Sequence, residues 1–127
     1  MSELASVRER IEGKRVVSAK DDRLVLDDGT ILSLYMSGSD CCAYAEGSWV
    51  VQPDNLEAII TDVTLEDIAE RPHSDVENGV RITILHNQNP VALADCYAGH
   101  NGYYFAVLSL KVSVPAAEDV DVKVVEA

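Results

Sequence analysis

Hydrophobic side chains recur at every second position through most of the chain from Arg15 onward, and short clusters of turn-forming residues interrupt them. The alternation is clearest between Val80 and His86. Successive side chains of a strand point to opposite faces of a sheet, so this pattern is typical of strands with one buried face. Short turns join antiparallel neighbours. We therefore predict an α+β protein that is mainly β, built as an antiparallel sheet or meander. A rolled or barrel-like sheet would also fit this pattern.

Five strands and their turns follow directly from this pattern. Residues 23–26 and 31–36 flank Asp27-Asp28-Gly29-Thr30, whose Asp-Gly pair predicts a tight hairpin. Later strands are expected at residues 80–86, 91–97 and 103–114, with turns at residues 87–90 and 99–102. Because they follow one another with short turns, these three strands predict a meander.

Two stretches before this meander are less regular. Residues 43–51 predict a strand or bulged turn that carries Trp49 inward. Residues 56–65 fit a helix or a strand, and their β-branched content favours a strand. Residues 66–71 fit a single helical turn before Pro72.

The two ends of the chain differ from the β-rich body at residues 15–114. Residues 1–13 predict a short helix, with apolar residues at spacings of three and four and Gly13 as a stop signal. Residues 115–127 alternate acids and valines, which predicts an acidic tail or an edge strand. The length of 127 residues predicts a single domain.

The net charge of -12 limits the classes of partner that the protein is expected to bind. Residues 24–127 hold four of the ten Lys and Arg residues but 17 of the 22 Asp and Glu residues. Nucleic-acid affinity comes largely from Lys and Arg, so we expect no direct nucleic-acid binding. We also expect no membrane association and a cytoplasmic location, because no apolar run approaches the ~20 residues of a span and no secretory signal is evident.

The motif Asp40-Cys41-Cys42 raises the question of thiol chemistry. A nucleophilic thiolate needs a nearby histidine, cation or helix N-terminus, and none is close in sequence. The adjacent carboxylate opposes thiol ionisation. Cysteine is often buried, and an Asp side chain can hold a turn. We therefore expect a structural role for Asp40, Cys41 and Cys42 and assign no catalytic residue, which leaves a cysteine-dependent enzyme as an alternative.

A metal site is a second interpretation of the cysteines. Cys41, Cys42, Cys96 and His100 are zinc ligands in kind. Their spacing does not match, because two cysteines are adjacent and Cys96 and His100 would be about 13 Å apart on a strand unless the chain folds at Gly99. We predict no metal and no cofactor, with this four-ligand set as the alternative.

Tyrosines provide the candidate binding surface. Asn101-Gly102 predicts a turn, because both residues accept a positive φ, and Tyr103 and Tyr104 would then begin a strand on opposite faces. Aromatic rings give a large contact area at small entropic cost. The candidate patch consists of Tyr44, Tyr97, His100, Tyr103 and Tyr104.

The motifs Asp40-Cys41-Cys42 and Asn101-Gly102-Tyr103-Tyr104 together resemble a family of small proteins of unknown function found in phages of actinobacteria and in their hosts. The resemblance extends over roughly residues 24–114. It implies a β-rich phage accessory protein, or a related bacterial protein, with no established reaction.

The leading hypothesis is a non-enzymatic protein-binding module that acts on a host or phage protein. An acidic decoy that mimics nucleic acid is one alternative. A self-assembling structural protein, forming a homo-oligomer through its helix or its tail, is another. A small-ligand or cysteine-dependent enzyme is the third.

Overall fold

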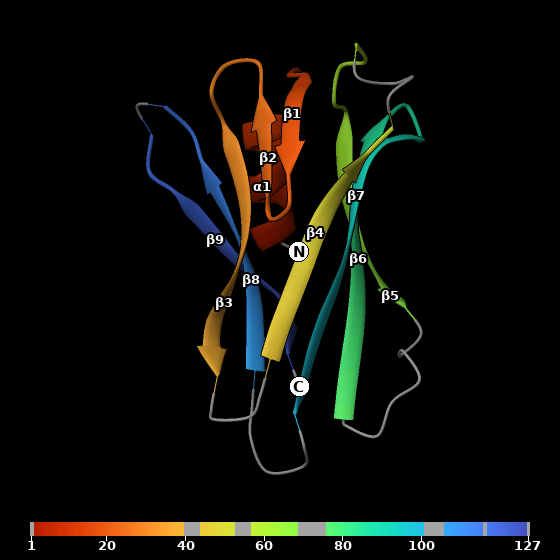
Figure 1. The fold of residues 1–127 in the computed structure, drawn as a ribbon. Helices are drawn as coiled ribbons and strands as arrows, with labels where there is room; N and C mark the ends of the chain where they lie inside the picture. The colour runs from red at the N-terminus through yellow and green to blue at the C-terminus, as the bar shows by residue number, and fades with distance from the viewer. Residues whose placement is uncertain are drawn as a thin grey trace.

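The part of the chain that the structure describes consists of two open antiparallel sheets and one helix (Figure 1). Its structure is a computed structural model that describes residues 2–39, 44–52, 57–68, 76–100, 106–115 and 117–126. The elements are α1 (Ser2–Ile11), β1 (Val16–Lys20), β2 (Arg23–Leu26), β3 (Ile31–Ser39), β4 (Tyr44–Val51), β5 (Asp62–Ile68), β6 (Val76–His86), β7 (Asn89–His100), β8 (Ala106–Ser113) and β9 (Val120–Glu126). The five-stranded sheet has the order β1-β2-β3-β8-β9, and the four-stranded sheet has the order β4-β7-β6-β5. The mainly-β prediction with a short N-terminal helix is confirmed, and neither sheet closes into a barrel.

The predicted β2–β3 hairpin is present. Leu26 carbonyl accepts from Gly29 N–H at 3.0 Å, and Leu26 N–H donates to the Thr30 carbonyl at 2.8 Å. Gly29 has φ 92°, a left-handed conformation that glycine adopts without steric cost. The turn is therefore a type I turn followed by a left-handed glycine, a common longer alternative to the two-residue Asp-Gly turn.

The predicted meander of the last three strands is wrong in its third member. β6 pairs with β7, but β8 pairs with β3 and β9 in the other sheet. Three strands are consecutive in both chain and sheet in each sheet, namely β5, β6 and β7 in one and β1, β2 and β3 in the other. The switch follows from burial, since β8 has buried apolar residues along its inner face and becomes a central strand of the five-stranded sheet.

Three local boundaries also differ from expectation. The turn predicted at residues 87–90 contains only Asn87 and Gln88, with φ 47° and 75°, and β7 starts at Asn89. β7 then continues through His100, so the turn expected from Gly99 does not begin there. Glu66–Ile68 belongs to β5 and not to a helical turn, because these residues pair with Gly79–Arg81 of β6. Residues 120–126 form the edge strand that was one of two expectations for the tail.

The core lies between the two sheets and beneath the helix. Val7 and Ile11 of α1 are fully buried in the same cluster as the inner residues of both sheets, and Trp49 of β4 faces this core as predicted. The helix contacts β5 and β9, which are edge strands of the two sheets, so it covers one side of the core. Among the described residues, no helix is long and apolar enough to cross a membrane.

Candidate functional site

The candidate site is the outward side of the four-stranded sheet, which we call the outer sheet face. Strand alternation turns Ala94, Cys96 and Ala98 of β7 into the core, so the residues between them point outward. The register places Glu46 opposite Tyr97, Ser48 opposite Asp95 and Val50 opposite Leu93. The outer sheet face consists of Tyr44, Glu46, Ser48 and Val50 of β4, Leu93, Asp95, Tyr97 and Gly99 of β7, Gly79, Arg81 and Thr83 of β6, and Thr64, Glu66 and Ile68 of β5.

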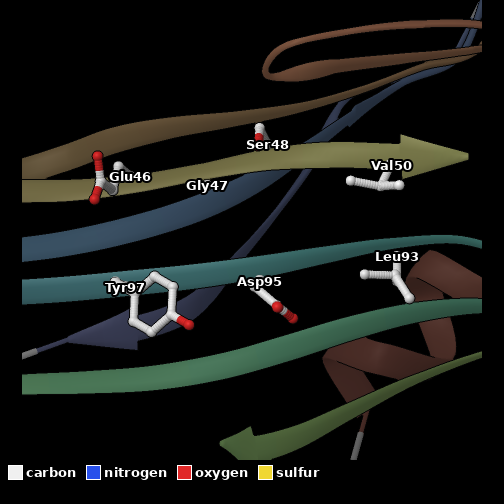
Figure 2. Close-up of a pocket in the computed structure, with 7 residues that line it drawn as sticks. All are labelled: Glu46, Gly47, Ser48, Val50, Leu93, Asp95 and Tyr97. Atoms are coloured by element: carbon white, nitrogen blue, oxygen red, sulfur yellow. The ribbon is translucent and has the colours of Figure 1, made fainter. Parts of the chain in front are cut away.

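A groove of about 440 Å³ runs along this face between β4 and β7 (Figure 2). Glu46 and Tyr97 lie at one end, and Val50 and Leu93 lie at the other. The side chains of Asp95 and Tyr97 lean from β7 toward β6, away from β4. The small Ser48 side chain does not fill the space that they leave. The groove is therefore a product of side-chain direction as well as of side-chain size.

Asp95 leans toward β6 because it binds Arg81. Arg81 Nε donates to Asp95 Oδ1 at 2.6 Å, and Arg81 Nη2 donates to Asp95 Oδ2 at 3.2 Å. The two residues are directly paired across β6 and β7. This two-point contact fixes both side chains in one geometry.

Tyr44 and Tyr97 each lie across a glycine of the neighbouring strand. A Cβ atom added to Gly79 would lie 3.0 Å from Tyr97 Cε1, and one added to Gly99 would lie 2.6 Å from Tyr44 Cζ. The glycines thus leave the space that the rings occupy, as cross-strand aromatic rings cover glycines in other sheets. Both tyrosines are held against the sheet with part of each ring exposed.

The charges of the two sheets differ. β4 to β7 carry six Asp and Glu residues and one Arg, whereas the five strands of the other sheet carry four Lys and Arg residues and two acids. The strands of the sheet that carries the groove are therefore negatively charged, whereas those of the other sheet are positively charged. Such a field attracts cationic partners over longer distances than direct contacts do.

The structure brings together part of the predicted tyrosine patch. Tyr44 and Tyr97 lie on the outer sheet face, and His100 follows Gly99 at the end of β7 with its backbone opposite Val76. Tyr103 and Tyr104 lie outside the described residues.

The residues of the two sequence motifs also lie outside the described residues, namely Asp40, Cys41, Cys42, Asn101 and Gly102. The strand ends that flank them are placed. Ser39 pairs with Ala106, and Tyr44 pairs with Gly99. Segment 40–43 links β3 to β4, and segment 101–105 links β7 to β8. Although they are far apart in sequence, both segments therefore join the β3–β8 pair of one sheet to the β4–β7 pair of the other.

Cys96 lies in the hydrophobic core and packs there. It is fully buried, and its Sγ donates to the Ala94 carbonyl at 3.7 Å. Burial, with a smaller contribution from the Asp95 charge, raises the pKa of the Cys96 thiol to about 12. A thiol with that pKa is not a nucleophile near neutral pH. β7 is continuous from Cys96 to His100, so the chain does not fold back at Gly99 to join them.

Within the described residues, no group of three His, Cys, Asp or Glu side chains could hold a metal ion. The four-ligand alternative depends on Cys41 and Cys42, which lie outside these residues.

Sequence reasoning did not single out the groove residues Glu46, Ser48, Val50, Leu93 and Asp95. The alternation in residues 44–51 and 91–97 could have placed them on the outward faces of their strands. It could not have shown that β4 and β7 are neighbours, because 37 residues of the printed chain, numbers 52–88, separate them.

The sequence model of one protein family, described as a domain of unknown function (DUF7448), matches residues 9–110. No curated protein and no solved structure matches the chain.

Proposed function

The chain belongs to the DUF7448 family, and from that premise we propose that it is a non-enzymatic protein-binding module that uses its outer sheet face. The proposed biological setting is that of a phage-type accessory protein acting on a host or phage protein in the cytoplasm.

The observation that carries the proposal is the combination of chemistry on this face. Val50 is a strand residue with 54% of its surface exposed, and it lies beside Leu93 at one end of the groove. Two tyrosines lie across glycines of neighbouring strands in the same sheet. Apolar and aromatic side chains surrounded by charged ones are characteristic of protein interfaces.

The rigidity of the face also supports a binding role. The register of β4, β7, β6 and β5 is continuous through Glu46, Tyr97 and Gly79 to Ile68. A backbone that is already ordered in a paired sheet loses little conformational freedom when a partner binds.

The test is co-purification of proteins with the affinity-tagged chain from actinobacterial cells, followed by quantitative mass spectrometry. Val50→Arg disrupts the outer sheet face. Val17→Arg is the matched control, because Val17 is a strand valine of β1 in the other sheet and is 57% exposed. We expect one stoichiometric partner that Val17→Arg retains and Val50→Arg depletes at least tenfold, as replacement of an apolar contact by a charge predicts.

Equal depletion by both variants, or capture of no stoichiometric partner, would contradict the proposal. A captured nucleic-acid-binding protein that added DNA displaces would identify the chain as an acidic decoy. Reciprocal capture by the tagged partner, with the same two variants, serves as the independent confirmation.

A further inference from the structure

We propose that the open edge of β5 pairs with an extended, basic segment of the partner protein, which adds a strand to the four-stranded sheet. This inference rests on the proposed function, because the added strand would continue the sheet whose outer face binds the partner. Edge strands bind extended peptides through backbone N–H and C=O groups, and the neighbouring side chains select the peptide sequence.

Of the four edge strands that the structure describes, β5 offers the most regular edge to a new strand. β1 and β9 each contain a register shift, and such bulges twist an edge away from further pairing. β4 is regular, but Trp49 N–H donates to the Asp21 carbonyl of the β1–β2 turn at 2.7 Å. β5 pairs with β6 from Asp62 to Ile68 without a shift, and its other side is the edge of the sheet.

The helix lies against the beginning of this edge. Arg8 of α1 lines a small cavity with the first two residues of β5, and its Nη1 atom lies 4.0 Å from Asp62 Oδ1. β5 continues past the helix to Ile68 (Figure 1). Glu66 and Asp67 in this second half are both exposed. The second half of β5 is therefore the part that offers its edge to a partner.

The two acids of this half define the charge of the strand that would pair there. Glu66 lies opposite Arg81 on the outer side of the sheet, and Asp67 lies opposite the buried Val80 on the inner side. The Arg81 guanidinium donates to Asp95, and neither Glu66 nor Asp67 forms an ion pair within the described residues. Consecutive residues of an added strand would lie beside these two acids, one on each side, where opposite charges attract. Two consecutive Lys or Arg residues therefore fit this edge.

The inner side of the edge has room for one of these basic side chains. A cavity of about 390 Å³ lies between β5, β6 and β9, and Asp67, Val80 and Val124 are among the residues that line it. The carbon chain of a lysine can pack on valine side chains while its ammonium group stays near a carboxylate. The cavity thus supplies the side-chain pocket that strand addition uses for specificity.

The same acids disfavour a second copy of β5 as the occupant. Pairing of two β5 strands would bring Asp62, Glu66 and Asp67 of both copies to one edge. Like charges on paired strands repel each other, so this arrangement is unfavourable. The acids therefore select a basic strand over a second copy of the chain.

The experiment is a ¹H–¹⁵N NMR titration of the full chain with the acetylated and amidated peptide Thr-Val-Thr-Lys-Lys-Thr-Val-Thr. The matched probe has Glu-Glu in place of Lys-Lys. We expect the lysine probe to shift the amide resonances of residues 65–68 and to slow hydrogen exchange there, and the glutamate probe to do neither. The double variant Glu66→Gln, Asp67→Asn should weaken the affinity for the lysine probe roughly fivefold, as expected for loss of two opposite-charge pairs across strands.

The double variant Asp21→Asn, Asp22→Asn is the matched control, because it removes two adjacent exposed acids from the β1–β2 turn. It should leave the titration with the lysine probe nearly unchanged. Equal weakening by both double variants would overturn the proposal in favour of a diffuse negative field. Thermal unfolding verifies that each variant remains folded.

Two other outcomes would also overturn the proposal. If the lysine probe does not bind, the acids of β5 serve to keep the edge unpaired. If the wild type forms a dimer in sedimentation velocity and its β5 amide resonances shift with protein concentration, the edge belongs to a second copy of the chain.

The two proposals fail in different ways. If the lysine probe does not bind β5 and Val50→Arg still depletes a partner, the outer sheet face binds proteins without strand addition and only the edge inference is wrong. If the probe binds β5 but no captured partner depends on Val50, the edge recognises basic strands and the proposed function is wrong.

Discussion

At the scale of single residues, the protein depends on a few positions where no larger side chain fits. Gly47 is the clearest, because a Cβ atom there would lie 2.9 Å from Cys96 Sγ and 3.2 Å from atoms of both Leu34 and Leu108. Cys96, Leu34 and Leu108 are buried core residues and belong to both sheets. Gly47 thus allows β4, one of the two strands that line the groove, to lie close to the core.

We expect Gly47→Ala to lower the free energy of unfolding by about 1–3 kcal/mol, because the added methyl group must displace packed core atoms. Cys96→Ala removes the atom nearest to that methyl group. The double variant should therefore lose less than the sum of the two single variants, a coupling that chemical denaturation can measure. Strict additivity would show that the contact with Cys96 is not the source of the loss.

At the scale of elements, the turns and linkers are held by specific polar contacts. Asp28 in the β2–β3 turn lies 2.8 Å from Lys14 Nζ, just before β1, and accepts from Thr30 N–H at 3.0 Å and from Thr30 Oγ1 at 2.6 Å. Hydrogen bonds from Lys14 and Thr30 lower the pKa of Asp28 to about 2 from its ordinary 3.8. These contacts join the segment that follows the helix to the first hairpin.

The lowered pKa of Asp28 gives the stability contribution a defined sign. The carboxylate is favoured in the folded state, so its contribution is present above pH 3.8 and is lost as the pH falls toward 2. We expect Asp28→Asn to be less stable than the wild type at neutral pH and the difference to shrink across that acidic window, measured by urea unfolding. Asp27→Asn, the same change one residue earlier, should show a smaller pH-dependent difference from the wild type. An equal difference for the two variants would show that Asp28 has no special role.

The β6–β7 turn contains one residue whose replacement should stabilise the protein. Asn87 and Gln88 both have positive φ, the geometry of a type I′ turn, and glycine is strongly favoured at the second position. We expect Gln88→Gly to raise the free energy of unfolding by about 0.5–1 kcal/mol, because it relieves a left-handed glutamine. Asn89→Gly, placed one residue later at the start of β7, should lower stability, since glycine weakens strands. Thermal unfolding of both variants would test this, and a loss of stability in Gln88→Gly would contradict it.

At the scale of the whole molecule, the two sheets share one core but differ in the charge of their strands. The helix closes the side of the core at β5 and β9, and the acidic strands gather in the four-stranded sheet. With a net charge of -12, like charges repel within the folded protein more than in the expanded unfolded chain.

We expect the unfolding temperature to rise by roughly 2–5 °C as salt increases from about 0.01 M to 0.15 M, because the screening length falls from about 30 Å to 8 Å. The double variant Glu66→Gln, Asp67→Asn removes two acids from the acidic sheet and should reduce this rise. Asp21→Asn, Asp22→Asn removes two acids from the β1–β2 turn and should reduce it less. Differential scanning calorimetry decides, and an equal effect of both pairs would contradict a stronger repulsion among the acids of the four-stranded sheet.

The sequence by itself determined the local structure of this protein. The alternation of apolar and polar residues, the Asp-Gly turn before Thr30 and the capped N-terminal segment were sufficient for the helix, the first hairpin and the inward position of Trp49, because these features depend on neighbours in the chain. Only the tertiary structure decided which strands share a sheet, and therefore that β8 leaves the meander and that β4 lies beside β7. Strand pairing over long separations depends on how two apolar faces bury each other, and period-two patterning is the same for every possible partner. The groove between Glu46 and Leu93 exists only because of that pairing and because Asp95 turns toward Arg81.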